Sequence, residues 1–301
     1  MIVYLKNHEI DREQWDNCIR NSGIVKPYPY SWFLDIVSPG WEALVDDEYD
    51  SVFPLPSKKR LSIQYISTPA FLQQLGAFSP DKPATSVIYE FLSYLPDFYK
   101  YVDLNIGQKV EHDGLKVTEK FNYVLDLSRT YDSVYNNFTT ECKRKVDTAE
   151  KKEIQLAEDI KPDEVIDLFL LSKTSPLEGI KPLDYQRLRN LMDFCLVNKK
   201  GKILGVRSGR KKLIYGLFFI QVPGSLTVIF DAHTLQSREK RIGYFLVNAL
   251  IKKHSSTKTL LDFAGSVTTE TLPFVESFGA RKVPYYRIYK SRLFWPAWMF
   301  R

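Results

Sequence analysis

The sequence predicts an α+β (mixed α/β) protein of two modules, each a mostly antiparallel mixed sheet flanked by helices. Helical and strand patterns alternate along the whole chain, and no fixed-period repeat or low-complexity tract interrupts them. The 301 residues, 44% of them hydrophobic, exceed a typical single domain and can fill two moderate cores. We expect modules at 1–126 and 127–301, because the pattern changes from strand to helix near Asp126.

The first module is expected to begin with a strand that leads into a helix. Its N-terminus lacks both a basic segment and a long apolar segment, so we expect no secretion signal and a cytoplasmic location. A proline in the first turn supports the last helix. The expected helices are 11–20, 31–37 and 83–95, and the expected strands are 41–45, 51–56, 61–67, 99–106 and 115–127.

The second module is expected to carry an antiparallel meander at 201–208, 212–222 and 225–233. Turn signals at 208–210 and at Pro223 and Gly224 join these strands. Four helices precede the meander, at 132–138, 141–151, 163–173 and 182–198, with a short strand at 154–158. A helix at 241–254, a strand at 259–265, a helix at 269–278 and a strand at 280–290 follow it.

Composition limits the classes of partner. The net charge of +6 suits anionic ligands without demanding nucleic acid, and the basic residues are interleaved with acids, so DNA binding is not expected. Three scattered cysteines indicate buried thiols and no metal site. No apolar run approaches the ~20 residues of a transmembrane helix. The aromatic tail 293–301 is expected to pack on its own domain, with insertion at a membrane interface as the alternative.

The segment with the clearest chemistry joins the strand 225–233 to the helix 241–254. That helix has one apolar face, formed by Ile242, Phe245, Leu246, Ala249 and Leu250, and should lie on the sheet. Its N-terminus would present unpaired N–H groups beside basic side chains, and a glycine there lets a ligand approach the backbone. Such an arrangement suits a pyrophosphate; a solvated basic loop is the alternative. The candidate cofactor-binding residues are Arg238, Lys240, Arg241, Ile242, Gly243 and Tyr244.

This loop resembles the cofactor loop of the GNAT acyltransferases, which has the pattern Arg/Gln-x-x-Gly-x-Gly/Ala. Arg238 matches the first position and Gly243 the last, while Arg241 stands where the first glycine would be. The resemblance implies coenzyme A or an acyl-CoA as cofactor. Val275 stands where such enzymes commonly have a tyrosine that protonates the departing thiolate.

Two further segments are similar to the Fem-type branch of that superfamily, whose members have tandem GNAT-like modules. ECKRKVDTAEKKEIQLAED resembles its basic helix and following strand, and LLDFAGSVTTETLPFVESFGA resembles its Asp-Phe-x-Gly-Ser loop and Phe-Gly-Ala turn. The resemblance extends from about Trp15, through PAFLQQLGAFS, to about Tyr289. It implies a tandem GNAT-like fold and a relation to aminoacyl-tRNA-dependent transferases.

The same segments supply candidate substrate-binding residues. The helix 141–151 is basic on one side, which suits a phosphate or carboxylate; a solvated charged helix is the alternative. In the strand-loop segment, Asp262 points away from its apolar neighbours and the following turn would approach a ligand; a structural role is the alternative. The candidates are Lys143, Arg144, Lys145, Asp262 and Ser266.

The candidate catalytic residues are Asp231, His233 and Tyr285. Asp231 and His233 alternate at the strand end, where either would take a proton from an attacking amine, directly or through water. Tyr285 would line the acceptor cleft. A turn-forming, hydrogen-bonded or packing role is the alternative for each. No Ser/His/Asp order, HExxH motif or phosphate-binding GK[ST] loop competes.

The sequence therefore predicts an N-acyltransferase that moves an acyl or aminoacyl group from an activated donor to a primary amine. Most of the catalysis would come from positioning the two substrates and from backbone N–H groups that stabilise the developing oxyanion. The strand end around Phe230 to His233 would hold the donor carbonyl. An acyl-CoA, an acyl carrier protein and an aminoacyl-tRNA all remain as donors. A non-catalytic binding protein that retains the fold is the alternative. The acceptor amine and the oligomeric state are not indicated.

Overall fold

The computed structural model describes residues 1–46, 48–60, 62–152, 154–172, 179–209, 211–264 and 271–293. The chain forms two compact units: residues 1–121 with 284–301, and residues 122–283. The first change of unit precedes the expected boundary at Asp126, and the C-terminal segment joins the first unit rather than the second. The division into folding domains stays a prediction, and each unit is described by itself.

The first unit contains two groups of hydrogen-bonded strands. β1 (Ile2–Leu5), β2 (Glu42–Asp46) and β3 (Val52–Leu55) form an antiparallel three-stranded sheet. A second group pairs β4 (Ser57–Arg60) with β5 (Ile63–Ser67), β5 with β6 (Tyr101–Ile106) in parallel, and β6 with β13 (Arg281–Ser291). This unit is therefore a mixed, mostly antiparallel structure.

Helices and aromatic side chains complete the first unit. The core includes Trp15 and Trp41, both fully buried with ring centroids 4.7 Å apart. The α1 N-cap Asp11 accepts hydrogen bonds from the backbone N–H groups of Glu13 and Gln14, which fixes the start of that helix. The helices are α1 (Arg12–Asn21), α2 (Ser31–Val37), α3 (Ala84–Ser93) and the 3₁₀ turn Asn7–Glu9.

The sheet of the second unit is built on the expected meander. β9 (Gly201–Arg207), β10 (Leu213–Val222) and β11 (Ser225–His233) pair antiparallel in sequence order. β8 (Leu156–Ala157) extends the β9 edge. On the other side, β11 pairs in parallel with β12 (Leu260–Asp262), which pairs antiparallel with the end of β7 (Lys116–Asp126).

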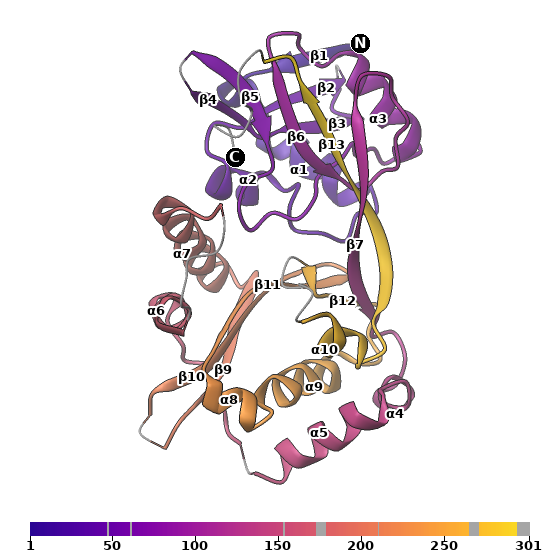
Figure 1. Ribbon diagram of the computed structural model, residues 1–301. Coiled ribbons are helices and arrows are strands. Elements are labelled where there is room, and N and C mark those ends of the chain that lie inside the picture. The colour runs from indigo at the N-terminus through magenta and orange to yellow at the C-terminus, as the bar shows by residue number, and fades with distance from the viewer. Residues whose placement is uncertain are drawn as a thin grey trace. The chain divides into compact units, whose positions relative to one another are not determined.

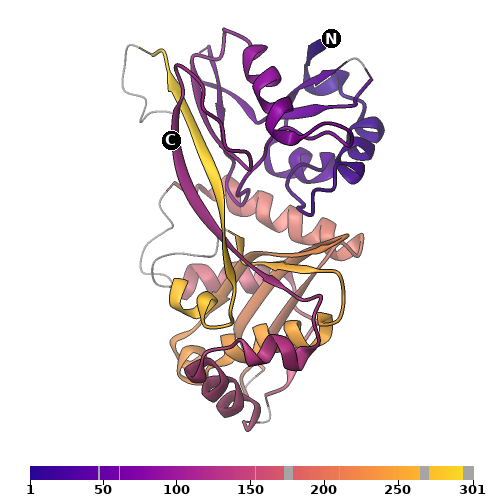
Figure 2. The ribbon, with the colours of Figure 1, turned by 90° about the vertical axis from the view of Figure 1, so that its right-hand side faces the viewer.

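Helices cover both faces of this sheet (Figure 1 and Figure 2). Neighbouring residues of β10 face opposite sides of the sheet. Leu217 belongs to the core under α9, whereas a Cβ on Gly216 would meet Val165 of α6. On the α6 face, Phe169 packs on Phe230 at 4.8 Å. The helices are α4 (Tyr131–Asn136), α5 (Thr140–Glu150), α6 (Pro162–Ser172), α7 (Pro182–Val197), α8 (Leu235–Glu239), α9 (Ile242–His254) and α10 (Leu272–Glu276).

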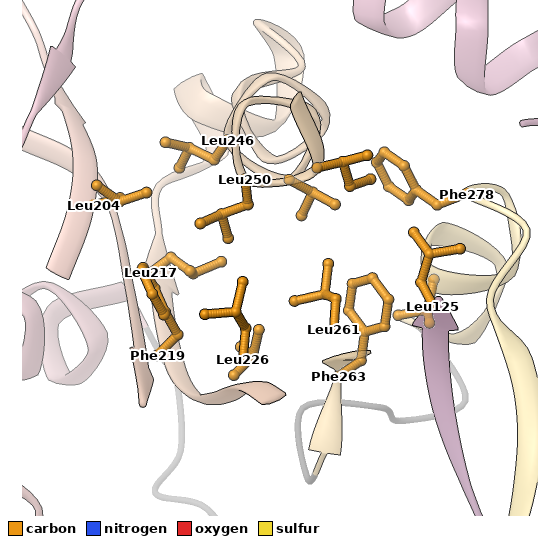
Figure 3. Packing of buried hydrophobic residues seen from close by; sticks show 14 of the residues in the cluster. Leu125, Leu204, Leu217, Phe219, Leu226, Leu246, Leu250, Leu261, Phe263 and Phe278 are labelled. Carbon is orange, nitrogen blue, oxygen red and sulfur yellow. The ribbon is translucent and has the colours of Figure 1, made fainter. Parts of the chain in front are cut away.

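The main core of the second unit lies between α9 and the sheet. Figure 3 shows Leu250 of α9 pointing toward Leu217 and Leu226 of the strands, and Leu246 on the side of the helix that faces Leu204. Leu246, Leu250 and Leu226 are each at most 1% exposed. Packing at this density fixes both the position and the rotation of α9 on the sheet.

Most expected elements are present, while the 3₁₀ turn Asn7–Glu9, the helix α8 and the strand β4 were not expected. The loop expected before the helix 241–254 contains a short helix, α8, because Thr234 caps it by accepting a hydrogen bond from the N–H of Ser237. The strand β4 was not expected, since Ser57–Arg60 is polar and lies at the edge of its group of strands. The three cysteines are free and buried, as predicted. The aromatic tail beyond Leu293 lies outside the described residues.

The described residues were expected to hold neither a transmembrane helix nor a metal site. None of their helices has both the length and the hydrophobicity that crossing a bilayer requires. Their His, Cys, Asp and Glu side chains form no group of three suited to a metal ion.

Truncation of Leu250 should destabilise the second unit. Leu250→Ala leaves a cavity between α9 and the sheet, and we expect a loss of about 2–5 kcal/mol in the free energy of unfolding. Urea unfolding followed by circular dichroism measures the change. Leu171→Ala is the matched control, because Leu171 is 78% exposed; equal losses for the two variants would contradict the described packing.

Candidate functional site

The end of β11 and the adjoining part of β10 bring three polar side chains together. The antiparallel register sets Tyr215 opposite His233 and Leu217 opposite Asp231. Because Asp231 and His233 are two residues apart on one strand, their side chains share a face. A methyl group on Gly243 of α9 would lie 3.4 Å from the Tyr215 ring, so this is the face that α9 covers.

These side chains form a continuous chain of hydrogen bonds with Arg238 of α8. Tyr215 Oη donates to Asp231 Oδ2 over 3.1 Å, and His233 Nδ1 lies 3.2 Å from the same oxygen. Arg238 Nε donates to His233 Nε2 over 2.7 Å. The imidazole also stacks on the Tyr215 ring, with the centroids 5.4 Å apart. The chain of contacts holds all four side chains in one arrangement.

The hydrogen bonds define the protonation of His233. A guanidinium N–H only donates, so Nε2 must accept, and the ring proton is therefore on Nδ1, which donates to Asp231. His233 is consequently neutral in this arrangement, with its lone pair covered by Arg238. Asp231 Oδ1, by contrast, accepts no hydrogen bond from the described residues. Asp231 and His233 are each about one quarter exposed, so solvent or an amine can reach the carboxylate.

Tyr215 is a permanent donor to this carboxylate. Burial, followed by the negative charge of Asp231 and the hydrogen bond to it, raises the pKa of Tyr215 well above its usual value of 10. The phenol thus stays protonated whenever the protein is folded near neutral pH.

The segment between α8 and α9 exposes unpaired backbone donors. Arg241 is the α9 N-cap and has a left-handed backbone with φ of +63°, which a glycine would adopt without steric cost. Its carbonyl accepts from the N–H groups of Tyr244 and Phe245. The N–H groups of Ile242 and Gly243 have no acceptor among the described residues. The helix therefore begins with two open donors beside Arg241.

The cations of α5 do not form one common surface. Arg144 is engaged with Glu141 through two hydrogen bonds of 2.8 Å, which lower the pKa of Glu141 to about 2. Lys143 donates to the carbonyl of Asn136. Lys145 alone reaches the predicted cofactor-binding residues: its Nζ donates to Tyr244 Oη over 3.2 Å and lies 4.9 Å from the ring centroid.

The remaining candidates lie apart from this cluster or outside the description. Asp262 is 2% exposed, and its Oδ1 accepts from Asn122 Nδ2 at 2.7 Å and from the N–H of Ala264 at 2.8 Å. This bonding closes the turn after β12. Ser266 lies outside the described residues. Tyr285 belongs to the first unit, where burial raises its pKa, so the structure does not join it to Asp231 within one unit.

The β12 edge of β11 opens beside Asp231. The parallel pairing with β12 ends at Thr227, opposite Asp262. β11 continues through His233 with no strand on that side among the residues that the structure describes. Alternate backbone N–H and C=O groups along this stretch, which includes Asp231, therefore have no strand partner on that side among the described residues.

A pocket of about 1010 Å³ adjoins the start of α9. Its lining combines apolar side chains with lysines from three separate segments. The lining residues are Lys152, Ile154, Gln155, Leu156, Ala157, Asp159, Val206, Arg207, Ser208, Gly209, Lys211, Ile214, Lys240 and Ile242.

Two features of this region were not identified from the sequence. The first is Tyr215, a single polar ring in an otherwise apolar strand. The expected hairpin turn at Pro223 and Gly224 was a usable signal, because pairing residues outward from that turn places Tyr215 near His233. Two of the three lysines of the pocket, Lys152 and Lys211, come from turns that are distant in sequence. No periodicity brings such positions together, so no sequence signal was available for them.

The structure is similar to solved structures of low sequence identity. A structure of FemX shares 13% identity and a TM-score of 0.65, with 93% of this chain and 96% of that chain covered. L-PGS from Bacillus licheniformis shares 13% identity, a TM-score of 0.56 and coverage of 96% and 95%. A C-terminal (DUF2156) domain assigned to a lysylphosphatidylglycerol synthetase from Agrobacterium fabrum shares 8% identity, a TM-score of 0.58 and coverage of 93% and 91%.

These similarities show the fold. The chain has a Fem-like tandem GNAT fold of the mixed α/β class, as its sequence resemblance implied. No protein-family model matches the sequence. No curated protein sequence matches it either.

Substitution of Tyr215 should test its protonation directly. We expect the Tyr215 phenol of the folded wild type to remain neutral above pH 10. The tyrosine absorbance change near pH 10 should therefore have the same size in the wild type and in Tyr215→Phe. Because the folded pKa is raised, the stability that this group contributes is present below pH 10 and is lost as the pH rises further. Ultraviolet absorbance titration of both proteins measures the difference; a missing component near pH 10 in the variant would contradict the buried hydrogen bond.

Proposed function

We propose that the chain transfers an acyl or aminoacyl group from an activated donor to a primary amine. The observation that carries this proposal is the open edge of β11, where Asp231 faces solvent next to the unpaired N–H groups that begin α9. The edge and the helix start offer positions for a donor, and the carboxylate offers a proton acceptor. The names of the similar structures include an aminoacyl lipid synthetase, which supports the same class of reaction.

The donor would bind across β11 and the start of α9. Residues at the helix start fit a pyrophosphate, since the N–H groups of Ile242 and Gly243 are unpaired and the cations of Lys240 and Arg241 have no ionic partner among the described residues. Coenzyme A carries such a group and, when acylated, supplies a thioester carbonyl. The left-handed Arg241 keeps the loop in a conformation typical of glycine while adding a positive charge.

The carboxylate of Asp231 would act as the base. A neutral amine attacks the donor carbonyl carbon, a carbon–nitrogen bond forms, and the bond to the leaving sulfur or oxygen breaks. Asp231 Oδ1 takes the proton that the amine nitrogen loses, directly or through a water molecule. His233 and Tyr215 donate to Oδ2, so they hold the carboxylate in place and leave Oδ1 free.

His233 would position the base rather than serve as one. Its Nε2 lone pair accepts from Arg238, which makes His233 unavailable for a proton while that bond persists. Of the two candidate residues at the strand end, Asp231 would therefore be the base and His233 would hold it in position. Leaving-group protonation would come from solvent, because Val275 is a buried apolar side chain.

The second candidate function is a binding protein that retains the fold without catalysis. Two observations favour a binding protein. Arg238 occupies the His233 nitrogen that could accept a proton. A buried valine stands at position 275, where a tyrosine could donate one. A binding protein would take up a donor at the same place and release it unchanged.

Loss of the Asp231 base should abolish transfer and spare donor binding. With acetyl-CoA and with aminoacyl-tRNA as donors and a panel of primary amines, we expect product formation, detected by mass spectrometry, to fall by about 10²-fold or more in Asp231→Asn. Donor affinity, measured by calorimetry, should change little.

Asp167→Asn is the control for this experiment. Asp167 is an exposed aspartate on α6, the helix that covers the opposite face of the sheet. Wild-type protein that binds donor and yields no product with any amine would support the binding protein instead. An Asp231→Asn variant as active as wild type would exclude Asp231 as the base.

A further inference from the structure

One face of the first-unit strands β6 and β13 carries a salt bridge with unused donors. The antiparallel register sets Tyr289 opposite Asp103, and Arg287 lies two residues before Tyr289, so these side chains share a face. Arg287 Nε donates to Asp103 Oδ1 over 2.5 Å, and Nη2 donates to Oδ2 over 2.6 Å. Tyr101 Oη also donates to Oδ2, over 3.2 Å. The ion pair uses two of the five guanidinium N–H groups, and Nη1 has no acceptor among the described residues.

Lys120 of β7 lies beside this ion pair. β7 is the neighbour of β13 in the sheet, and Tyr286 Oη donates to Glu119 Oε1 over 3.5 Å on the other face. The alternation of strand residues therefore sets Lys120 and Arg287 on the same side. Lys120 is half-buried, and burial followed by the charge of Arg287 lowers its pKa, although Asp103 acts in the opposite direction. Its ammonium group contacts no hydrogen-bonding or ionic partner in the part of the chain that the structure describes.

Tyr285 adds a third donor to this face. It lies two residues before Arg287 on β13, so the two side chains point to the same side of the sheet. Burial raises the pKa of Tyr285, and its hydroxyl therefore keeps its proton near neutral pH. That hydroxyl has no hydrogen-bond partner within the described ranges of the chain.

The three unused donors are better satisfied by an anion than by water alone. An unpaired ammonium group that is half-buried beside a guanidinium costs free energy, because burial removes solvent and like charges repel. An oxyanion between Lys120 and Arg287 would offset both effects. Lys120, Arg287 and Asp103 together leave one net positive charge, so a monoanion balances the cluster, whereas Asp103 would repel a second negative charge.

We propose that Lys120, Arg287 and Tyr285 bind the carboxylate group of a small molecule. The two oxygens of a carboxylate match the edge of the planar guanidinium that Asp103 leaves free. Lys120 and Tyr285 each donate to the same group. The site belongs to the first unit and is independent of the transfer proposed for the second unit.

Binding of a simple carboxylate to the full chain tests the proposal. N-acetylalanine is titrated into the isotope-labelled protein in low-salt buffer, because salt screens such contacts, and the NMR signals of β6, β7 and β13 report binding. We expect Lys120→Gln and Tyr285→Phe each to raise the dissociation constant by about tenfold or more. The matched controls are N-acetylalanine amide, which lacks the carboxylate, and Lys116→Gln, which changes an exposed lysine of the same strand.

Thermal unfolding separates a ligand site from a structural contact. Lys120→Gln removes a half-buried charge without a partner among the described residues, so the ligand-free variant should melt no lower than the wild type. N-acetylalanine should raise the melting temperature of the wild type and leave that of Lys120→Gln unchanged.

Three results would overturn the proposal. The first is no binding of N-acetylalanine to the wild type. The second is an affinity in folded Lys120→Gln and Tyr285→Phe equal to that of Lys116→Gln. The third comes from dimethyl phosphate, a monoanion without a carboxylate: tighter binding of this probe at the same signals would assign the cluster to a phosphodiester.

Discussion

The packing of α9 on the sheet of the second unit is the constraint on which the site depends. Leu246 and Leu250 insert toward the side chains of the sheet strands, and the resulting core fixes where α9 begins (Figure 3). A buried amide secures the outer side of the helix, since Asn248 accepts from Tyr131 Oη at 3.0 Å and donates to Glu150 at 3.0 Å. The open N–H groups and Gly243 therefore stand at a defined place beside the β11 strand end.

Several charged side chains of the second unit lie near the start of α9. One carboxylate, Asp231, lies on the sheet face under the start of α9 and is held by Tyr215 and His233. Around it, Arg238 is used to fix His233, whereas Lys240 and Arg241 have no ionic partner among the described residues. The same short segment thus contains one cation that contacts His233 and two cations without an ionic partner among the described residues.

Much of this arrangement follows from local sequence patterns. The meander was predictable from two-residue alternation and turn residues, and α9 from the apolar face that begins at Ile242. The short helix α8 was not, because its residues are polar and its cap at Thr234 is a local hydrogen bond rather than a periodic pattern. That omission matters, since α8 is the element that returns Arg238 to His233.

Contacts between distant segments account for the rest. The pairing of β13 with β6 joins the C-terminal strand to the first unit, which chain order alone does not indicate. In the sequence, Lys145 is one of several similar cations. The packing of α5 on α9 places it against Tyr244. The sequence therefore pointed to the strand end and the loop as a candidate site, while tertiary packing shows which of their side chains contact one another.

Titration of the full chain with acyl donors is the most direct test of donor binding at the start of α9. We expect saturable calorimetric binding of acetyl-CoA or of a non-hydrolysable aminoacyl-tRNA analogue, weakened by about tenfold or more in Arg241→Glu. No binding of either donor, or equal binding by the wild type and a folded Arg241→Glu variant, would contradict it.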